Sequence, residues 1–561
     1  MSKKPSRKRS LNVLFENSFK KNWDRPALTN YNQNTLYYKD VALEIAKLHL
    51  FFESCGIQPG DKIAVCGRNH VNWAVAYLAA MTYGAVVVPI LHEFQAANLR
   101  HLVTHSEARI FFVGDLNWRE LESLDLPGVE VVVTLNDFTV VRSINPAATD
   151  GWKEKLPERM AERYPNGFRP DDINYFVDQP EDLALISYTS GTSGFSKGVM
   201  IPYRALLSNI QFAAEAEPQM DCNSRMVSML PTAHMYGMIF EFLFEMTIGA
   251  QVFFLTRLPS PRVILEAMNS VKPDTIIAVP LVIEKIYKNK LQPFISKARI
   301  KLMLNLPVID KMVKNKFRES LVQAFGGKFG EVIIGGAPFN REAEAFLKRI
   351  NFPFTIGYGM TECAPIITYV HWDKTKLYSC GKAAPRMRIK IDSDDPKKVP
   401  GEVLVKGENV FLGYYKNEMA TKDAFVDGWF RTGDMGVIDG DGYLYLKGRC
   451  KSMILGPSGQ NIYPEEIESI LNNRPYVVES LVIEDDFKLV ALVYPDFEQA
   501  QEDGLDREQL QAKLKEGVQL ANLELDQYCK VHDVEIVDQE FEKTPKRSIK
   551  RYLYQRGVNT Q

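Results

Sequence analysis

The stretch from Tyr188 to Met200 reads YTSGTSGFSKGVM and follows a short apolar run from Leu183 to Ile186. Its glycines lack the Cβ atoms that keep a backbone away from a ligand, and its hydroxyl groups and single ammonium group supply hydrogen-bond donors. The glycines are Gly191, Gly194 and Gly198, the hydroxyls belong to Thr189, Ser190, Thr192 and Ser193, and the ammonium belongs to Lys197. Because the stretch contains no carboxylate, its composition predicts a cradle for a polyphosphate.

The residue order in this stretch excludes the commoner glycine-rich motifs. A Walker loop needs Gly-Lys followed by Ser or Thr, whereas Lys197 follows Ser196 and precedes Gly198. The glycine spacing is not that of a dinucleotide site, and the absence of a nucleophile elbow argues against Ser193 as an attacking serine. The plainer alternative is a flexible polar loop between a strand and a helix that begins near Pro202.

Length and composition describe an ordinary enzyme of more than one domain. The chain has 561 residues, is 45% hydrophobic and 25% charged, and carries a formal net charge of -2. This length predicts at least two domains, and the near-neutral balance gives no overall attraction to nucleic acid. Seven scattered cysteines without metal-ligand spacing suit a reducing compartment, with the cytoplasm as the default.

Two stretches raise the question of membranes. The basic first nine residues are not followed by an apolar core, so they predict a disordered arm rather than a secretory signal, with weak attraction to anionic lipid as the alternative. The apolar stretch from Val71 to Leu91 is interrupted by polar residues, Gly84 and Pro89. It predicts a buried helix to Tyr83 and then a strand, Ala85 to Ile90.

The first part of the chain alternates helical and extended patterns. The predicted elements are a helix ending at Gly56, a strand at Lys62 to Cys66, a helix at Gln95 to His105, and strands at Arg109 to Val113 and Val129 to Val133. Alternation of this kind is typical of a parallel sheet covered by helices.

Two later strands also run into glycine turns. Val332 to Ile334 opens into Gly335, Gly336, Ala337 and Pro338, and Phe354 to Ile356 leads into GYGMTEC, residues 357–363. Ligands of open α/β sheets lie at such strand ends. Glu362 is the only carboxylate of the second turn and suits Mg²⁺ carried in on a nucleotide, while Thr361 can donate to phosphate.

Two further residues have the chemistry of a site. His234 lies in LPTAHMYGM, where it is either a satisfied core residue or part of the site wall. Asp434 ends WFRTGD, and one carboxylate can accept two hydrogen bonds from ribose hydroxyls.

Taken in order, these motifs resemble those of the adenylate-forming enzymes, and GYGMTECAP with GQNIYPEEIE is similar to long-chain fatty acyl-CoA synthetases. Ser193 and Ser196 replace the usual Thr and Pro of the phosphate loop. The resemblance implies an α/β fold, with a large N-terminal domain of parallel-sheet subdomains and a small distorted β-barrel, and a small α+β C-terminal domain. Residues 1–440 would form the large AMP-binding domain and 441–561 the small mobile one.

The resemblance also implies roles for particular residues. It gives Lys197, Glu362 and His234 to catalysis, with Glu362 as the metal ligand, Lys451 as the hinge, and Ser458 and Gly459 as contacts to coenzyme A. The residues implied to bind ATP are Thr189, Ser190, Gly191, Thr192, Ser193, Gly194, Gly336, Ala337, Pro338, Gly357, Tyr358, Gly359, Thr361, Asp434 and Arg449.

The C-terminal tail, EKTPKRSIKRYLYQ, departs from the family. Alignment by its Ile-Lys-Arg ending puts Ser548 where the family has its adenylation lysine. Either Lys546 or Lys550 then reaches the site, with Lys546 favoured, or adenylation relies on the loop and metal.

The implied reaction joins a medium- or long-chain fatty acid, or another carboxylic acid, to coenzyme A through an acyl adenylate, with ATP and Mg²⁺. Two alternatives stay open: an adenylation enzyme that loads a carrier protein, and a non-catalytic acyl- or nucleotide-binding descendant. No nucleic-acid partner is expected, and a homodimer is left open. The lysine-rich segment from Glu284 to Leu321 is either a solvated helical face or a peripheral contact to a membrane that delivers a fatty substrate.

Overall fold

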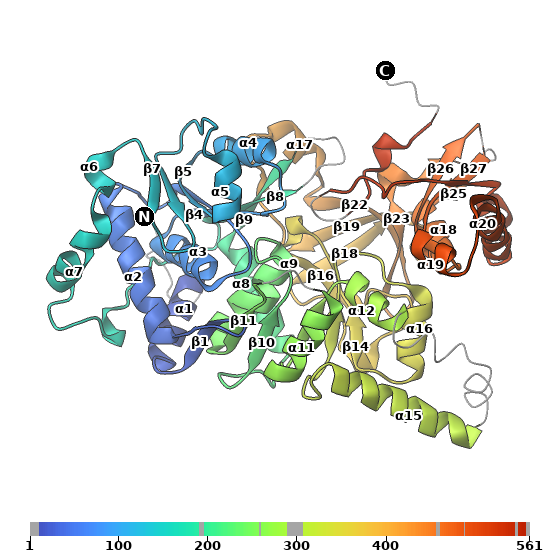
Figure 1. Ribbon diagram of the computed structural model, residues 1–561, viewed down its shortest axis with the longest axis horizontal. Helices are drawn as coiled ribbons and strands as arrows, with labels where there is room; N and C mark the ends of the chain where they lie inside the picture. Colours follow the sequence, from blue (N-terminus) through green and yellow to red (C-terminus); the bar gives the residue numbers. More distant parts are fainter. Residues whose placement is uncertain are drawn as a thin grey trace.

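The computed structural model describes residues 10–189, 196–256, 260–288, 307–455, 460–486, 488–544 and 548–556, with the backbone alone for 307–310. The N-terminal and middle parts of the chain form one large body, and the C-terminal part forms a lobe at one end of it (Figure 1). The expected α/β class is confirmed.

The largest sheet has eight strands in the order β20, β9, β8, β4, β3, β5, β6, β7. Their bounds are β3 Lys62–Cys66, β4 Val86–Ile90, β5 Ala108–Val113, β6 Val131–Thr134, β7 Val140–Ser143, β8 Leu183–Thr189, β9 Lys197–Pro202 and β20 Gly413–Tyr414. The five central strands are parallel, whereas β7 and β9 run against their neighbours. β-Branched runs such as the VVVPI of β4 are buried on both faces, which is why this sheet reads as continuous apolar sequence.

Strand β9 is a feature that the sequence analysis did not predict. It pairs with β8 so that Lys197 lies opposite Thr189, and helix α8 (Tyr203–Ala216) follows it directly. The glycine-rich stretch therefore joins two hydrogen-bonded strands instead of a strand and a helix. The alternation in KGVMIP is short and contains Gly198 and Pro202, both unfavourable in strands, and this hides it from pattern reading.

Helices α2 (Tyr38–Ser54) and α3 (Val71–Tyr83) pack against each other beside the large sheet. The predicted burial of α3 is confirmed, since all but one of its first twelve residues are buried and Trp73 stacks on Tyr77 with ring centroids 5.3 Å apart. The helix ends at Gly84, whose φ of 89° is a left-handed conformation that glycine tolerates. Within the described ranges, no helix has the length and apolar character needed to cross a membrane.

Two smaller sheets complete the α/β part of the large body. One has the order β10, β11, β1, β2, and the other has three parallel strands in the order β12, β13, β14. Their bounds are β1 Pro26–Asn30, β2 Thr35–Tyr37, β10 Arg225–Ser228, β11 Gln251–Phe254, β12 Ile276–Ala278, β13 Val332–Ile334 and β14 Phe354–Ile356. The strands predicted at 332–334 and 354–356 are confirmed by β13 and β14.

An antiparallel region follows, where the resemblance predicts a small distorted barrel. One sheet has the order β18, β19, β22, β21, and β23 also pairs with β22, further along the strand than β21. A second sheet has the order β15, β16, β17. Their bounds are β15 Tyr358–Gly359, β16 Ile366–Tyr369, β17 Lys382–Ala383, β18 Met387–Asp392, β19 Gly401–Gly407, β21 Phe425–Val426, β22 Trp429–Ile438 and β23 Leu444–Arg449. Because β23 pairs with β22, residues 444–449 belong to a sheet of the large body. The division at 440 stays a prediction.

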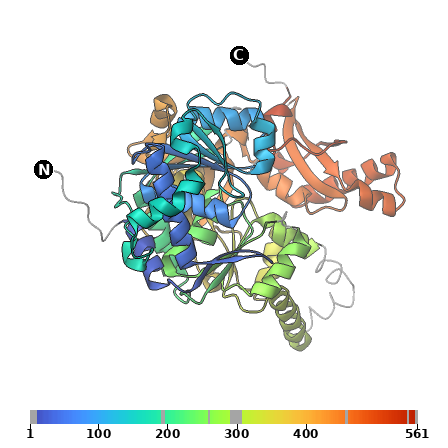
Figure 2. The ribbon, with the colours of Figure 1, turned by 60° about the vertical axis from the view of Figure 1, so that its left-hand side comes forward.

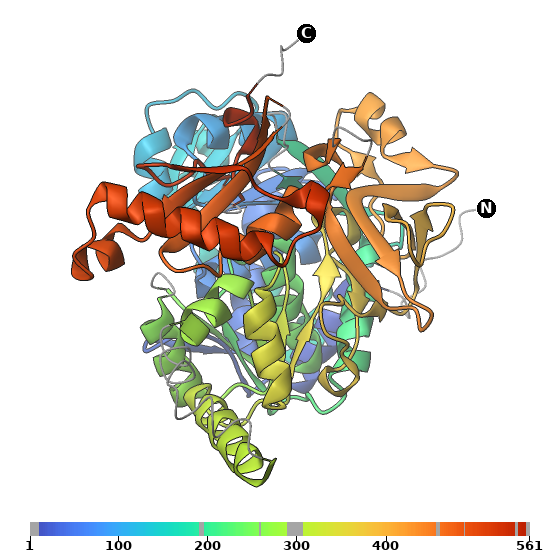
Figure 3. The same cartoon turned by 90° about the vertical axis from the view of Figure 1, so that its right-hand side faces the viewer.

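The C-terminal lobe is an α+β unit with its own apolar core. Figure 2 shows it as a separate lobe beside the large body, and in Figure 3 it faces the viewer. A three-stranded sheet of β26 (Val477–Asp485), β27 (Lys488–Pro495) and β28 (Asp533–Ile536) carries the helices. These are α18 (Pro464–Leu471), α19 (Phe497–Glu502) and α20 (Arg507–Asn522), preceded by the short hairpin of β24 (Ile454–Leu455) and β25 (Asn461–Ile462).

Candidate active site

The predicted phosphate loop connects β8 to β9, which pair as an antiparallel hairpin. Of its predicted ligands, Thr189 is the last residue of β8, whereas Ser190, Gly191, Thr192, Ser193 and Gly194 lie outside the described residues. Lys197 opens β9, beside β20 at the edge of the sheet. The pairing of β8 with β9 therefore fixes the position of the Lys197 backbone, on the strand next to Tyr414.

Lys197 and Glu362 are connected by a tyrosine that the sequence analysis did not single out. The Lys197 Nζ lies 4.7 Å from the centre of the Tyr414 ring, and the Tyr414 hydroxyl donates a 3.1 Å hydrogen bond to Glu362 Oε1. Glu362 is only 8% exposed, in the 3₁₀ turn η5 (Thr361–Cys363). Burial and the nearby Glu362 carboxylate raise the pKa of the Tyr414 hydroxyl. The aromatic face supports a cation on one side while the hydroxyl group orients a carboxylate on the other.

This arrangement fits the predicted metal role of Glu362. A carboxylate has two oxygens, and Tyr414 donates to one of them. Within the described residues, no cluster of three or more His, Cys, Asp or Glu side chains forms a metal site elsewhere. A hard, nearly buried oxygen ligand beside a phosphate hairpin suits a magnesium ion that shares its coordination with phosphate oxygens and water.

A second group of side chains gathers at Asp434, in the middle of β22. Tyr358 donates a 2.5 Å hydrogen bond to Asp434 Oδ2, and Arg449 Nε lies 2.8 Å from Oδ1. Arg449 closes β23 directly opposite Asp434 in the strand register. Burial raises the pKa of the Asp434 carboxyl group and Arg449 opposes this, while the carboxylate raises the pKa of the Arg449 guanidinium. Three residues distant in sequence thus form one polar group that the motifs alone did not join.

The glycine turns after β13 and β14 meet at one edge because their strands are parallel and in register. Gly357 N–H donates to Ile334 O at 2.9 Å, which ties the second turn to the first. Gly336 has a φ of 90°, and a Cβ on Gly359 would lie 2.2 Å from Pro365 O, so both positions require glycine. Ala337 and Pro338 complete the exposed side of the first turn. Thr361 is 5% exposed at the start of η5, and its carbonyl accepts from Ala364 N–H.

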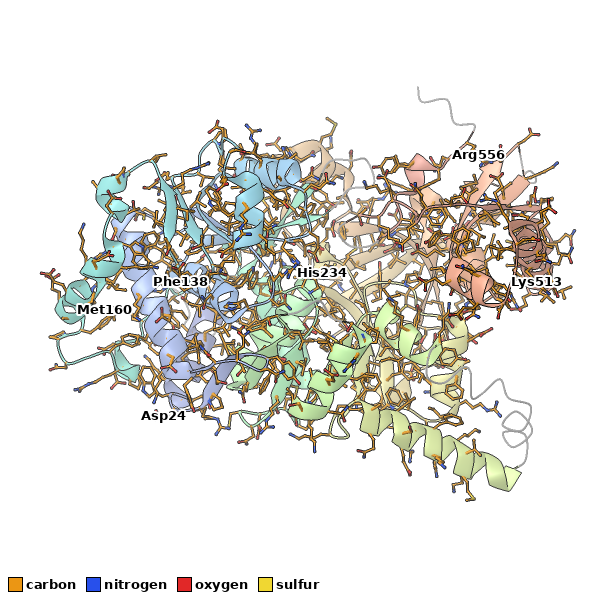
Figure 4. The ribbon with its side chains drawn as sticks, viewed as in Figure 1. Asp24, Phe138, Met160, His234, Lys513 and Arg556 are labelled. Carbon is orange, nitrogen blue, oxygen red and sulfur yellow. The ribbon has the colours of Figure 1, made fainter. Side chains whose placement is uncertain are left out.

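His234 lies near the centre of the molecule, between the N-terminal and middle parts of the chain (Figure 4). It caps helix α9 (Met235–Met238), where its Nδ1 accepts a 3.3 Å hydrogen bond from Tyr236 N–H. It also lines a small pocket at the carboxyl ends of β4 and β8. The pocket is lined by Pro89, Ile90, Leu91, Phe94, Ser187, Tyr188, Ala233, His234 and Met235. His234 therefore combines a capping role with a position in the wall of a pocket beside the phosphate hairpin.

The predicted C-terminal residues are separated in the structure. Lys451 lies in the 3₁₀ turn η7 (Cys450–Ser452) after β23, while Ser458, Gly459 and Lys546 lie outside the described residues. Lys550 Nζ forms a 3.1 Å ion pair with Glu542, which raises the pKa of the ammonium group. Within the described part of the tail, Lys550 is thus engaged inside the small lobe.

The two lobes meet through polar contacts at the end of α18. Lys288 Nζ donates to Asn472 O at 3.2 Å, and the side-chain amides of Asn340 and Asn473 are in contact. Glu466 accepts from Lys447 at 3.0 Å and lies 3.5 Å from Arg341 of the large body. Glu466, in the first turn of α18, therefore bridges the small lobe and the large body, a position that no sequence motif indicates.

Comparisons with known proteins cover almost the whole chain. The model of the AMP-binding enzyme family matches residues 15–415, and that of the AMP-binding enzyme C-terminal domain matches residues 451–556. Long-chain-fatty-acid–CoA ligase FadD15 of Mycobacterium bovis is 28% identical over 474 residues, covering 80% of this chain and 74% of that protein.

Solved structures with the same fold act on other acids. The anthranilate CoA ligase AuaEII in complex with anthranoyl-AMP has a TM-score of 0.78 at 18% identity, covering 97% of this chain and 96% of that one. O-succinylbenzoate coenzyme A synthetase of Bacillus subtilis, in complex with ATP and magnesium ion, has a TM-score of 0.73 at 20% identity, covering 96% and 98%. Because the first family model spans well over half of the sequence, the chain belongs to the AMP-binding enzyme family.

Proposed function

We propose that this protein activates a carboxylic acid with ATP and transfers the acyl group to coenzyme A. The observation that carries the proposal is the linked set Lys197, Tyr414 and Glu362, which brings a cation to the face of one ring and a carboxylate to the hydroxyl group of the same ring. Membership of the AMP-binding enzyme family supports the same reaction class, since its relatives include named CoA ligases.

Each group has a task in the first step. A carboxylate oxygen of the acid attacks the α-phosphorus of ATP, and pyrophosphate leaves. The Lys197 ammonium opposes charge that develops on the phosphate oxygens, and Asp434, oriented by Arg449, accepts from ribose hydroxyls. Glu362 would hold Mg²⁺, which supplies charge neutralisation on the phosphates. In the second step the sulfur of coenzyme A attacks the acyl carbonyl, AMP leaves, and the thiol proton passes to solvent.

For the acid itself we propose a medium- or long-chain fatty acid. The support is the name of the FadD15 relative, against which stand structural neighbours that take anthranilate and O-succinylbenzoate. The test is pyrophosphate release with a panel running from acetate to oleate and including aromatic acids. A maximum at acetate or at an aromatic acid would overturn the fatty-acid assignment and leave the reaction class standing.

The acceptor is tested separately. Product formation that depends on coenzyme A supports the ligase, whereas adenylate that accumulates unchanged on addition of coenzyme A favours loading of a carrier protein. Absence of pyrophosphate release with every acid would favour a non-catalytic descendant.

Variants of the two linked groups test the site. Lys197→Ala and Glu362→Gln should each lower adenylate formation by about a hundredfold or more, because each removes a charge that acts on the transferring phosphate. Lys328→Ala is a matched control, since Lys328 is half exposed and pairs with Asp274 on the surface. Full activity in either site variant would contradict the assignment.

The tail lysine is also a proposal. We assign adenylation to Lys546, because Lys550 is held by Glu542. Lys546→Ala should lower pyrophosphate release at least tenfold, about 1.4 kcal/mol of barrier, and Lys550→Ala should not. The reverse pattern would move the role to Lys550, and no effect from either would leave adenylation to the hairpin and metal.

Peripheral membrane contact is proposed for helix α15 (Pro307–Ala324). The helix extends away from the large body (Figures 1 and 3), with Lys311 and Lys316 exposed and Met312 71% exposed. Phe317 anchors it by packing on Phe346 with ring centroids 5.8 Å apart. The rest of the lysine-rich segment, residues 289–306, lies outside the described residues.

Flotation with liposomes tests this contact. Binding should require anionic lipid and should fall in a Lys311→Glu, Lys316→Glu variant, because cationic side chains near an anionic surface contribute about 1 kcal/mol each. Lys513→Glu on α20 is the control, since that lysine is half exposed on the other lobe. Equal flotation of all three proteins would remove the idea.

A further inference from the structure

The turn that carries His234 is held by two side chains from other parts of the fold. It spans residues 229–234, between β10 and α9, and its backbone groups bond to Asn69 and Glu241. Neither residue belongs to a motif of the sequence analysis.

Asn69 holds the turn from the side of the large sheet, in the connection between β3 and α3. Its Nδ2 donates to Leu230 O at 2.6 Å and to Ser228 Oγ at 3.3 Å. Its Oδ1 accepts from Thr232 N–H at 2.9 Å and from the Thr232 hydroxyl at 3.2 Å. One amide group therefore satisfies both a carbonyl and an N–H of the same short turn, which fixes the turn in one conformation.

Glu241 holds the turn from the helical segment that follows it. It lies in the π-helical segment η3 (Ile239–Leu243) that continues α9, and its side chain is completely buried. Its Oε2 accepts from Leu230 N–H at 3.0 Å and from the Ser228 hydroxyl at 3.3 Å, while its Oε1 has no hydrogen-bond partner among the described residues. A π-turn inside an α-helix is uncommon and is frequent at functional sites.

The packing leaves the turn little freedom. A Cβ on Gly237 would lie 3.0 Å from Leu230 Cβ and 3.1 Å from Pro231 O, so the helix touches the turn directly. Burial raises the pKa of the Glu241 carboxyl group well above its usual range. The end of this fixed turn, Ala233 and His234, lines the pocket together with Ser187 and Tyr188 of β8.

We infer that Glu241 and Asn69 are positioning residues that place Ala233 and His234 against the end of β8, so that the acid is held in line with the nucleotide. This inference rests on the proposed function. It predicts that loss of the Glu241 acceptor impairs the chemical step more than nucleotide binding, because Lys197 and Asp434 lie on other elements.

The test compares two buried acids on one helix. Glu245 lies one turn after Glu241, in α10 (Phe244–Ile248), is equally buried, and neither of its carboxyl oxygens has a hydrogen-bond partner among the described residues. Glu241→Met should lower kcat for adenylate formation at least tenfold, with KM for ATP changed less than threefold. Glu241→Gln, which keeps an acceptor oxygen, should restore kcat to within about threefold of the parent. Glu245→Met and Glu245→Gln should both keep kcat within threefold of the parent.

Hydrogen exchange gives a second readout that does not depend on activity. The amides of Leu230 and Thr232 should exchange at least tenfold faster in Glu241→Met and unchanged in Glu245→Met. Asn69→Ala should likewise lower kcat for adenylate formation while changing KM for ATP much less. A folded Glu241→Met protein with the kcat and the amide exchange rates of the parent would overturn the inference. Loss of folding in both Glu241→Met and Asn69→Ala would also overturn it, because these residues would then be required for the fold itself.

The two proposals fail in different ways. If the parent protein activates no acid, the proposed function is wrong, and the exchange rates still report whether the turn is clamped. If the parent is active and the Glu241 variants match the Glu245 controls, only the positioning role is wrong.

Discussion

At the scale of single residues, Tyr414 shows how the site depends on a contact between distant parts of the sequence. Its ring supports Lys197 and its hydroxyl bonds to Glu362, although it belongs to neither motif. The motifs predicted which residue types the site needs. The ring between them was hidden because GYYKN offers two adjacent tyrosines, and only the strand pairing of β20 with β9 decides which of them faces the hairpin.

Tyr414→Phe isolates the hydroxyl group from the ring. The variant keeps the aromatic face under Lys197 and loses the hydrogen bond to Glu362, so KM for magnesium-ATP should rise about tenfold, as a bond to a charged group contributes about 1.5 kcal/mol. Initial rates of pyrophosphate release at varied ATP measure it. Tyr415→Phe is the control, because the Tyr415 hydroxyl bonds to the exposed Glu107. An unchanged KM for magnesium-ATP in Tyr414→Phe would mean that Glu362 does not need the hydrogen bond from Tyr414.

Asp434→Asn tests the second group of side chains. The change removes the charge that Arg449 neutralises and weakens acceptance from ribose hydroxyls, so KM for ATP should rise about tenfold or more while kcat changes less. A comparison of ATP with 2′-deoxy-ATP measures the ribose contact. The discrimination between these two nucleotides should shrink in the variant, and equal discrimination in both proteins would place the ribose elsewhere.

At the scale of elements, a pair of buried carboxyl groups lies where β13 begins and α8 ends. Glu331 and Glu217 are almost fully buried, and the two carboxyl groups repel one another. Tyr369 donates to Glu331, Trp372 N–H donates to it at 3.1 Å, and Thr275 donates to Glu217. Burial, followed by the charge of Glu217, raises the pKa of Glu331 to about 9. Glu331 therefore keeps its proton at neutral pH.

This pair predicts a stability that depends on pH. An unfolded Glu titrates near pH 4.5 and the folded one near 9, so between these values the unfolded state releases a proton that the folded state keeps. Stability from this group therefore falls as the pH rises through that window. Glu331→Gln removes the effect, and its gain over the parent in free energy of unfolding should be small near pH 5 and should grow to several kcal/mol near pH 8.5. Urea unfolding at several pH values measures it, and a gain that does not grow with pH would contradict the pair.

Many of the helices and strands could be predicted from the sequence. Apolar runs gave most of the parallel strands, since strands buried on both faces leave continuous apolar sequence, and α3 was recognisable by the same logic. Strand β9 and the clamp of Asn69 and Glu241 were not predictable. Strand β9 is short and begins with Lys-Gly. Asn69 and Glu241 lie far apart in the sequence, and only the folded structure shows that both bond to the same turn.

At the scale of the whole molecule, the polar contacts between the two lobes, among the residues that the structure describes, gather around α18. Lys288, Asn340 and Arg341 on the large body meet Asn472, Asn473 and Glu466 on the small lobe. Partly exposed contacts of this kind contribute little individually, so the lobes can separate at low cost.

A reversible cross-link tests whether the small lobe must move. Asn340→Cys with Asn473→Cys, joined by a short disulfide-forming linker, should keep at most one of the two half-reactions, because one arrangement of the lobes cannot serve both steps. Reduction should restore the other half-reaction. Single-cysteine variants treated in the same way control for the native cysteines. Full rates of both steps in the cross-linked protein would show that the lobes work without rearrangement.

The pairing of β20 with β9 also bears on how the protein is made. Because β20 is contributed by residues 413–414, the strand that carries Lys197 keeps an open edge while the next two hundred or so residues leave the ribosome. At about 5–20 residues per second this lasts ten seconds or more. During that interval the edge is open to pairing with other nascent chains, and the contact between Lys197 and Tyr414 forms only after most of the large body has been synthesised.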